Sequence, residues 1–234
     1  RKDRLNRCIK MIKEYSDEII DALQKDFGNR DPKSSFLTEI ASTIGVLEHA
    51  IKNVDKWTKD EKRPSNVDRP FFIRMLMGFL GSKSYIKYQP LGTVGVISPW
   101  NFPVNLILAP LGGIFAAGNR AMIKPSELTP ATSEVTKKMF EAYFDKSEAA
   151  VFTGDAEVGA AFSALPFDHL LFTGGTQIGK KVMKAASDNL VPVTLELGGK
   201  SPVIVDEDAN LSEVAKKVMR GKTMNAGQIC LAPD

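Results

Sequence analysis

Apolar residues recur every three, four or seven positions along the N-terminal part of the chain. In residues 1–27 they predict the buried face of an amphipathic helix that ends at Gly28, before Pro32. The same spacing predicts a second helix over residues 35–59. The apolar positions of the two helices are Leu5, Ile9, Ile12, Ile19, Leu23 and Phe27, then Leu37, Ile40, Ile44, Leu47, Ile51 and Val54. We interpret residues 1–63 as helices that pack on a neighbouring domain.

The pattern changes after residue 63, where proline, glycine and bulky apolar residues replace the helical spacing. Within this stretch, Tyr85-Ile86-Lys87-Tyr88 has the alternation that is typical of a strand. We expect residues 64–90 to form an arm of loop and strand that is used for association.

From residue 91 onwards, short β-rich runs alternate with helical stretches. The expected strands are residues 92–97, 121–123, 149–152, 169–172, 191–195 and 202–205. The expected helices are residues 103–117, 130–144, 158–163, 177–186 and 211–225. Thr129 and Pro130 supply an N-cap and a proline at the first helical position. Such alternation predicts an α/β fold with a Rossmann-like parallel sheet over residues 91–226. Residues 227–234 are then the start of a second domain.

Composition and charge narrow the class of protein. The chain has 234 residues, of which 43% are hydrophobic and 25% charged, as is ordinary for a globular protein. Its 31 basic and 28 acidic residues are interspersed and give a net charge of +3, which does not indicate a nucleic-acid partner. The longest apolar run, residues 106–117, contains Pro110 and is shorter than the ~20 residues of a membrane helix. We therefore expect no membrane span.

The two cysteines, Cys8 and Cys230, lie far apart, with no Cys-x-x-Cys and no histidine nearby. This spacing indicates neither a metal site nor a disulfide framework. Residues 1–25 carry a charge every few positions and lack the apolar core of a secretory signal. A reducing cytoplasm is therefore the expected location. The first residue is not Met, which is compatible with a processed or trimmed N-terminus.

A glycine-containing turn follows the strand expected at residues 169–172, with the sequence Thr173-Gly174-Gly175-Thr176-Gln177-Ile178-Gly179. Glycines at a strand-to-helix turn let backbone N–H groups and the helix N-terminus approach a pyrophosphate. The spacing is Gly-x-Thr-x-x-Gly, however, and not the Gly-x-Gly-x-x-Gly of dinucleotide-binding folds. An ordinary strand–helix corner explains the turn about as well.

Two further strand ends carry charged residues. The first is Lys124-Pro125-Ser126-Glu127, which could hold phosphate and ribose hydroxyls, because ligands of open sheets bind at the carboxyl ends of strands. A solvated loop is the simpler interpretation. The second is Glu196, which ends an apolar run and precedes Leu197-Gly198-Gly199-Lys200. It is either a desolvated general base or a carboxylate exposed at the sheet edge.

Cys230 and Asn101 are the remaining candidates. Cys230 follows the last expected helix in Asn-Ala-Gly-Gln-Ile-Cys, and a cysteine in apolar company is more often buried filler than a nucleophile. Asn101 lies in Ser-Pro-Trp-Asn-Phe-Pro at residues 98–103 and offers an amide donor suited to an oxyanion. A plain turn explains that segment equally well.

Together, and in this order, these segments resemble the aldehyde dehydrogenase superfamily from about residue 91 to residue 234. The resemblance lies in residues 98–103, 124–127, 172–179, 196–200 and 227–230. The two N-terminal helices are similar to the short N-terminus of the class 3-like branch. Residues 162–174, Phe-Ser-Ala-Leu-Pro-Phe-Asp-His-Leu-Leu-Phe-Thr-Gly, look most like the coniferyl aldehyde dehydrogenases.

The resemblance implies the cysteine-dependent oxidation of an aldehyde, with coniferyl or a similar aromatic aldehyde as the expected substrate. Cys230 would be the nucleophile, and the Asn101 side chain and the Cys230 backbone N–H would hold the oxyanion. Hydride would then leave for the nicotinamide, and Glu196 would activate the water that hydrolyses the thioester. Relatives that reduce acyl-phosphates or acyl-CoA keep the cysteine, but the carboxylate at Glu196 favours the hydrolytic branch.

The resemblance also implies a nicotinamide cofactor, NAD in preference to NADP. Lys124 and Glu127 would hold the adenine ribose, where a carboxylate bonds both hydroxyls and repels a 2′-phosphate. Trp100 would lie beside the nicotinamide, and the turn from Gly174 to Gly179 would hold the pyrophosphate. The other residues that we assign to the cofactor are Ser126, Phe172, Gly175, Thr176, Ile178, Leu197 and Gly198. Gly175 stands where the family often has serine, which removes one potential hydroxyl contact to phosphate.

The downstream half of the family, with most of its catalytic domain and a Glu-x-Phe-Gly-Pro segment, has no counterpart in these residues. We therefore expect this chain to be the N-terminal part of a longer protein, inactive by itself and a homodimer or higher homo-oligomer when complete. A class 3-like fatty-aldehyde dehydrogenase is the nearest alternative. A non-catalytic nucleotide-binding or assembly protein is the alternative of another class, and the presence of Cys230, Glu196 and Asn101 argues against it.

Overall fold

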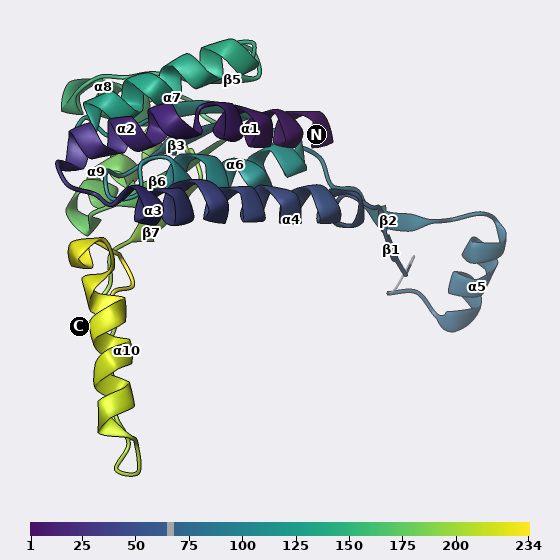
Figure 1. The fold of residues 1–234 in the computed structure, drawn as a ribbon. Helices are drawn as coiled ribbons and strands as arrows, with labels where there is room; N and C mark the ends of the chain where they lie inside the picture. Colours follow the sequence, from purple (N-terminus) through teal and green to yellow (C-terminus); the bar gives the residue numbers. More distant parts are fainter. Residues whose placement is uncertain (65–67) are drawn as a thin grey trace.

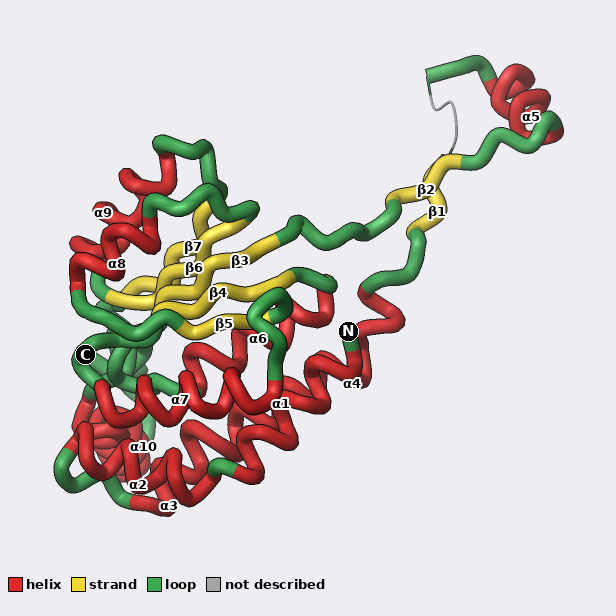
Figure 2. Tube along the Cα trace, turned by 90° about the horizontal axis from the view of Figure 1, so that it is seen from above, coloured by secondary structure: helices red, strands yellow, loops and turns green. Residues whose placement is uncertain are grey.

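A parallel sheet organises the protein, whose computed structural model describes residues 1–64 and 68–234. Within these residues the sheet has five strands: β3 (Thr93–Ile97), β4 (Arg120–Lys124), β5 (Ala149–Val151), β6 (His169–Gly174) and β7 (Val193–Leu197). Their order is β5-β4-β3-β6-β7, so β3 is central and the chain returns past it between β5 and β6 (Figure 2). This confirms the predicted α/β fold. It also creates a topological switch between β3 and β6, which is where open parallel sheets bind ligands.

Helices cover both faces of the sheet. On one face lie α8 (Ala156–Ser163) and α9 (Thr176–Ser187), and on the other lie α6 (Asn105–Ala117) and α7 (Pro130–Tyr143) (Figure 2). The N-terminal helices pack against α6 and α7 from outside. Two hydrophobic cores result, one on each face of the sheet.

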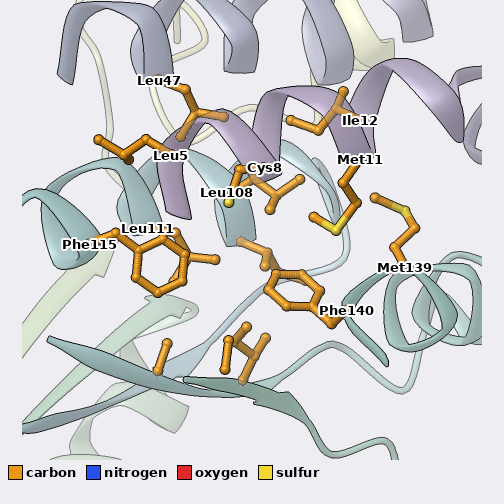
Figure 3. Packing of buried hydrophobic residues seen from close by; sticks show 14 of the residues in the cluster. Leu5, Cys8, Met11, Ile12, Leu47, Leu108, Leu111, Phe115, Met139 and Phe140 are labelled. Atoms are coloured by element: carbon orange, nitrogen blue, oxygen red, sulfur yellow. The ribbon is translucent and has the colours of Figure 1, made fainter. Parts of the chain in front are cut away.

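The larger core lies between the N-terminal helices, α6, α7 and the sheet (Figure 3). Its fully buried side chains include Leu5, Met11, Leu111, Phe115 and Phe140. Burying an aliphatic or aromatic side chain of this size contributes ~1.5–3 kcal/mol. The smaller core, under α8 and α9, contains Phe162, Phe167, Leu170 and Phe172.

The first predicted helix is in fact two helices, α1 (Lys2–Glu14) and α2 (Ser16–Phe27), which meet at Tyr15. The break lets α1 pack on α6 while α2 packs on α7. A spacing of seven between the apolar residues on either side of Tyr15 hides the break in the sequence. The second predicted helix begins early, at α3 (Pro32–Ser35), and reaches α4 (Ser42–Trp57) through the π-helical turn η1 (Phe36–Ala41).

An ion pair fastens α1 to the sheet. Glu148, just before β5, accepts two hydrogen bonds of 2.8 Å from Arg7. These bonds lower the pKa of Glu148 to about 2. Arg7 also donates to the carbonyl of Tyr143 at 2.8 Å, and its guanidinium lies 4.6 Å from the centre of the Phe144 ring.

The start of α7 corrects one detail of the sequence prediction. Thr129 is the N-cap residue, but its side chain makes no capping bond. Asp26 of α2 caps the helix instead, because its carboxylate accepts the backbone N–H groups of Ala131 at 3.0 Å and Thr132 at 2.8 Å. The capping group comes from a distant part of the chain, so local sequence could not reveal it.

An arm projects from the domain, as Figure 1 shows. It consists of the antiparallel pair β1 (Glu61–Arg63) and β2 (Ser84–Ile86), with α5 (Phe71–Phe79) between them. The predicted strand is present in part, whereas α5 was not predicted, because its sequence is short and apolar at nearly every position. Residues 65–67 of the predicted arm lie outside the described residues. The role of the arm in association stays a prediction.

The last segments depart most from prediction. Residues 202–205, predicted as a strand, are exposed and form none in the described structure. Ile204 is 92% exposed, and an apolar run without a neighbouring strand gains neither ladder bonds nor burial. Beyond it, α10 (Leu211–Thr223) projects away from the sheet (Figure 1). Among the described residues, no helix is both long enough and apolar enough to cross a membrane.

Candidate active site at the carboxyl edge of the sheet

A cleft of about 210 Å³ opens at the carboxyl ends of β3, β6 and β7, beside the switch point. It brings together Asn101, Glu196 and Cys230, which are far apart in the sequence. The full lining is Pro99, Trp100, Asn101, Leu106, Thr173, Gly174, Gly175, Glu196, Leu197, Gly198, Gln228, Ile229 and Cys230. Sequence reasoning missed Pro99, Leu106, Thr173, Gln228 and Ile229, although all of them lie within six residues of a residue that it selected.

The segment between β3 and α6 carries Trp100 and Asn101. The Asn101 side-chain amide donates one hydrogen bond, of 2.9 Å, to the backbone carbonyl of Gln228, two residues before Cys230. A primary amide has two N–H groups, and the second makes no bond within the described residues, so it is available to a ligand in the cleft. Trp100 is 37% exposed, and its ring lies 6.2 Å from that of Phe27.

Cys230 reaches the cleft through an unusual backbone reversal. The short helix η2 (Met224–Gly227) follows α10, and Asn225, Ala226 and Gly227 all have positive φ, at 48°, 55° and 79°. Left-handed conformations cost about 1–2 kcal/mol for residues other than glycine, so surrounding contacts must hold them. The Asn225 side-chain amide is one such contact, because it donates to the carbonyl of Asn101 at 3.1 Å.

The two cysteines have opposite environments. Cys230 is exposed and lines the cleft. Cys8 lies in the larger core, where burial raises the pKa of its thiol to about 12 and keeps it protonated. The interpretation of a cysteine as buried filler therefore applies to Cys8 and not to Cys230.

Glu196 lies near the end of β7, where alternate residues face opposite sides. Val193, Leu195 and Leu197 pack against the smaller core, while Thr194 and Glu196 are exposed. Of the two interpretations that the sequence left open, the structure shows the exposed carboxylate, here lining the cleft.

The glycine turn runs from β6 into α9 and depends on close packing. A Cβ at Gly174 would lie 2.6 Å from the buried Phe172 ring, so this position favours glycine. A Cβ at Gly179 would lie 2.9 Å from a terminal methyl of Leu197, which would have to shift. At Gly175 a Cβ would meet nothing within 4 Å, so the surface is open there. Thr176 and Ile178 are exposed on the first turn of α9.

Phe172 does not take the position that the sequence prediction gave it. We assigned it to the cofactor, but its ring is only 4% exposed and packs inside the smaller core, beneath the glycine turn. It supports the shape of the turn from below. Phe172 is buried because helices cover both faces of the sheet, so an apolar side chain of β6 packs under a helix on either face.

A second cleft, of about 290 Å³, lies beyond the ends of β4 and β5. Lys124 is buried and its Nζ lies 2.8 Å from Glu127 Oε2, while the Glu127 side chain is 44% exposed. The hydrogen bond from Lys124 lowers the pKa of Glu127, which is therefore ionised. Ser126 lines the cleft, but its hydroxyl accepts the Leu128 N–H at 3.2 Å and so also shapes the loop.

Two of the residues that sequence reasoning missed in this second cleft could have been found from their place after a strand. Thr153 and Gly154 follow the end of β5, just as the selected residues follow other strands. The remaining members, which come from the loop after β4 and from α7, are Pro125, Pro130, Ser133 and Glu134.

Comparison with known proteins agrees with this arrangement. Residues 1–234 match the aldehyde dehydrogenase family. A probable coniferyl aldehyde dehydrogenase of Caulobacter vibrioides is 56% identical over 98% of this chain and 46% of its own length. A coniferyl aldehyde dehydrogenase of Pseudomonas sp. is 53% identical over 100% of this chain and 46% of its own length. The chain thus spans about half the length of these relatives.

Solved structures give the same answer. A substrate-bound Staphylococcus aureus AldH superposes with a TM-score of 0.90 and 44% identity, covering 100% of this chain and 48% of its own. A Mycobacterium tuberculosis aldehyde dehydrogenase complexed with NAD+ superposes with a TM-score of 0.83 and 27% identity, covering 99% of this chain and 46% of its own. The chain belongs to the aldehyde dehydrogenase family.

Proposed function

We propose that the protein oxidises an aldehyde to the carboxylic acid with NAD as the oxidant. The observation that carries this proposal is the meeting of Asn101, Glu196 and Cys230 in one cleft at the switch point of the sheet. A nucleophile, an amide donor and an exposed carboxylate are the groups that a covalent route through a thioester needs.

Cys230 attacks the aldehyde carbon as a thiolate, forming a C–S bond and placing negative charge on the former carbonyl oxygen. The free N–H of the Asn101 amide and the backbone N–H of Cys230 are the donors available to this oxyanion. Donors that are already in place stabilise charge as it develops and do not have to reorganise during the reaction. The bond from Asn101 to Gln228 holds the amide next to the cysteine.

When bound, the nicotinamide supplies the acceptor for the hydride that leaves the thiohemiacetal carbon, which produces a thioester on Cys230. Glu196 then removes a proton from water as the water oxygen attacks the thioester carbonyl. The C–S bond breaks, the acid leaves and the Cys230 thiolate is restored. Splitting one difficult oxidation into capture, hydride loss and hydrolysis is the advantage of the covalent route.

The described residues fit a dinucleotide. The ionised Glu127 is an acceptor for ribose hydroxyls in the second cleft, and Gly175, Thr176 and Ile178 present an open helix N-terminus to a pyrophosphate. Trp100, Leu197 and Gly198 line the first cleft, where the nicotinamide would reach Cys230. The NAD+ complex of the M. tuberculosis relative supports this choice of cofactor.

The names of the relatives support coniferyl aldehyde as the substrate. A steady-state panel tests this with a full-length protein, by which we mean one that carries this chain and extends to the length of its relatives. We expect NAD reduction with a higher kcat/KM for coniferyl aldehyde than for long-chain aliphatic aldehydes. The reverse order would support the fatty-aldehyde alternative, and the absence of reduction with every aldehyde would support a non-catalytic protein.

We expect full-length protein to bind NAD about tenfold more tightly than NADP, a difference of ~1.4 kcal/mol. The carboxylate of Glu127 accepts bonds from both ribose hydroxyls, and a 2′-phosphate removes one bond and adds like charge. Glu127→Gln should narrow the gap, mainly by improving NADP binding. Titration of both cofactors measures the ratio of their Kd values in the wild type and in the variant. Glu141→Gln on α7 is the control for a lost surface charge. Equal affinities in the wild type, or no response at position 127, would remove Glu127 from the ribose site.

A further inference from the structure

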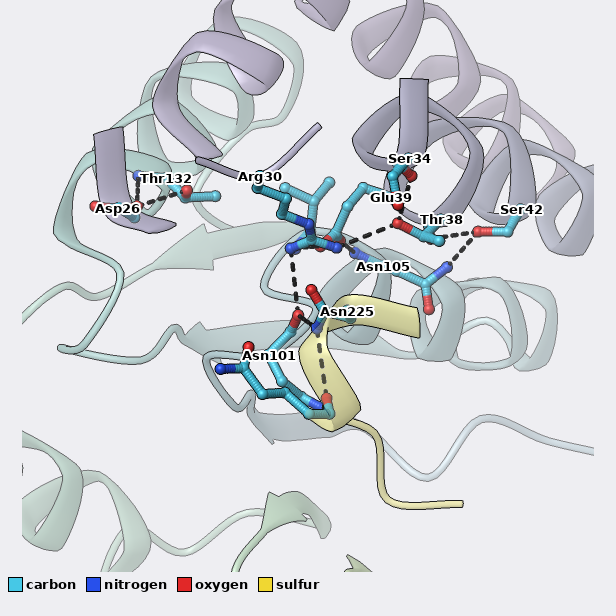
Figure 4. A network of polar contacts seen from close by, with 12 residues as sticks. Asp26, Arg30, Ser34, Thr38, Glu39, Ser42, Asn101, Asn105, Thr132 and Asn225 are labelled. Atoms are coloured by element: carbon cyan, nitrogen blue, oxygen red, sulfur yellow. Dashed lines mark hydrogen bonds and ion pairs between the residues drawn. The ribbon is translucent and has the colours of Figure 1, made fainter. Parts of the chain in front are cut away.

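A buried ion pair lies directly behind the segment that carries Asn101 (Figure 4). Arg30, which follows α2, and Glu39, in the π-helical turn η1, are 5% and 0% exposed in their side chains. Arg30 Nη1 lies 2.9 Å from Glu39 Oε1. We interpreted both helices from their sequence as packing elements alone, and the pattern of apolar residues gave no sign of this pair.

Glu39 holds the start of α6. Its Oε2 accepts the backbone N–H groups of Val104 at 3.1 Å and of Asn105 at 2.8 Å. A carboxylate that receives the first N–H groups of a helix both satisfies them and matches the helix dipole. Because α6 starts four residues after Asn101, the carboxylate fixes one end of the Asn101 segment.

Arg30 holds the segment itself. Its Nη1 donates to the carbonyl oxygen of Asn101 at 3.3 Å, and its guanidinium lies 4.7 Å from the Phe27 ring centre and 5.2 Å from that of Phe102. The same Asn101 oxygen accepts the Asn225 amide from the reversal before Cys230. One carbonyl group therefore joins the buried pair to the two segments that carry the amide donor and the nucleophile.

A simpler need for stability does not explain this arrangement. Burying an ion pair carries a large desolvation penalty, and apolar residues of the same size often stabilise a protein as well or better. Burial raises the pKa of Glu39 to about 7 even though Arg30 and the two amides favour its charged form. What the pair supplies is directional bonds to named backbone atoms of the Asn101 segment, which an apolar pair cannot make.

We propose that Arg30 and Glu39 are positioning residues, which set the place of the Asn101 amide relative to Cys230 through the backbone of residues 101–105. The proposal rests on the proposed function, since it concerns the same oxyanion. Neither side chain lines the cleft, so both act through Asn101 and not on the substrate.

The test is the rate constant of the NADH burst in full-length Arg30→Lys, measured by stopped-flow absorbance with saturating aldehyde. Lysine keeps the charge but loses the planar group whose Nη1 contacts Glu39 and Asn101 while Nη2 donates to Thr38 at 3.2 Å. It also loses the flat face that lies against two rings. We expect the burst rate constant to fall about 10- to 100-fold, because a misplacement of about 1 Å can cost 10²-fold. The Kd for NAD should stay within about twofold. Burst amplitude counts the active sites, so it separates a slower site from a smaller folded fraction.

Arg7→Lys is the matched control. Arg7 also pairs with a glutamate, donates to a backbone carbonyl and lies over a phenylalanine ring, but it does so between α1 and β5, away from the cleft. Its burst rate constant should equal that of the wild type. If Arg30→Lys does not fold, Glu39→Gln replaces it, because glutamine keeps the shape and one acceptor for the α6 amides.

A double variant decides whether Arg30 acts through Asn101. Asn101→Ala removes the side-chain donor, at an expected cost of about 10²–10³ in the burst rate constant. Adding Arg30→Lys should then change that constant by no more than about twofold, whereas independent effects would multiply. Multiplied effects, or a wild-type rate in Arg30→Lys, would overturn the positioning proposal alone. A wild-type protein that forms no NADH with any aldehyde would instead overturn the proposed function.

Discussion

Replacing Cys230 with alanine in the full-length protein is expected to remove both the NADH burst and steady-state turnover. Without the sulfur no C–S bond forms, so no thiohemiacetal exists from which hydride can leave. The loss should be roughly 10⁴-fold or more, the scale seen when a covalent nucleophile is deleted. Stopped-flow absorbance of NADH and a steady-state assay with coniferyl aldehyde measure the two quantities, and an unchanged Kd for NAD would show that the cofactor site remains.

Cys8→Ala is the control for this experiment. Its thiol is buried in the larger core and protonated, so its removal should cost some stability and leave the burst rate constant unchanged. A burst that survives Cys230→Ala would assign the nucleophile to another residue. Loss of the burst in Cys8→Ala, with the affinity for NAD unchanged, would also contradict the assignment of Cys230 as the nucleophile.

Glu196→Gln is expected to separate the two halves of the reaction. Capture by Cys230 and hydride loss precede hydrolysis, so the burst should keep its amplitude. Steady-state turnover should fall by roughly 10²–10⁴-fold, as is typical when a general base is lost. Hydroxide does not need the base, so turnover of the variant should recover in part as the pH rises.

The position of Glu196 gives this prediction its basis. The carboxylate lines the cleft from the end of β7 and is open to solvent, whereas Asn101 and Cys230 are joined through Gln228. Glu207→Gln, in the exposed loop after β7, is the control for the loss of a surface carboxylate. If the burst disappears together with turnover in Glu196→Gln, the carboxylate acts before hydride loss and its assignment to hydrolysis is wrong.

Most single elements of the sheet could be predicted because their signals are local. The apolar run of β6, the glycine turn after it and the amphipathic face of α9 lie next to one another in sequence. The prediction of a strand at residues 202–205 was wrong because a strand also depends on residues that are distant in the sequence. A strand is stabilised by its neighbours, and apolar composition alone does not supply one.

Side-chain contacts between segments that are far apart in the sequence could not be predicted. Asp26 caps α7, and Arg30 and Glu39 hold the Asn101 segment, yet Asp26 and Glu39 lie in predicted helices whose periodicity indicates packing only, and Arg30 lies in the link between them. A charged residue on an amphipathic helix is usually solvated, so its sequence context gives no reason to expect burial. Such residues become visible only when their partners are placed in space.

By itself, the sequence determined the α/β class, the alternation of strands and helices, and the presence of Lys124, Glu127, Glu196 and the glycine turn at strand ends. These follow from side-chain periodicity and from the conformations that glycine and proline allow. Only the tertiary structure decided that β3 lies beside β6, and that a left-handed reversal after α10 returns Cys230 to Asn101. Strand order and chain reversal depend on long-range packing, which local spacing does not encode, and they turn separate strand ends into one site.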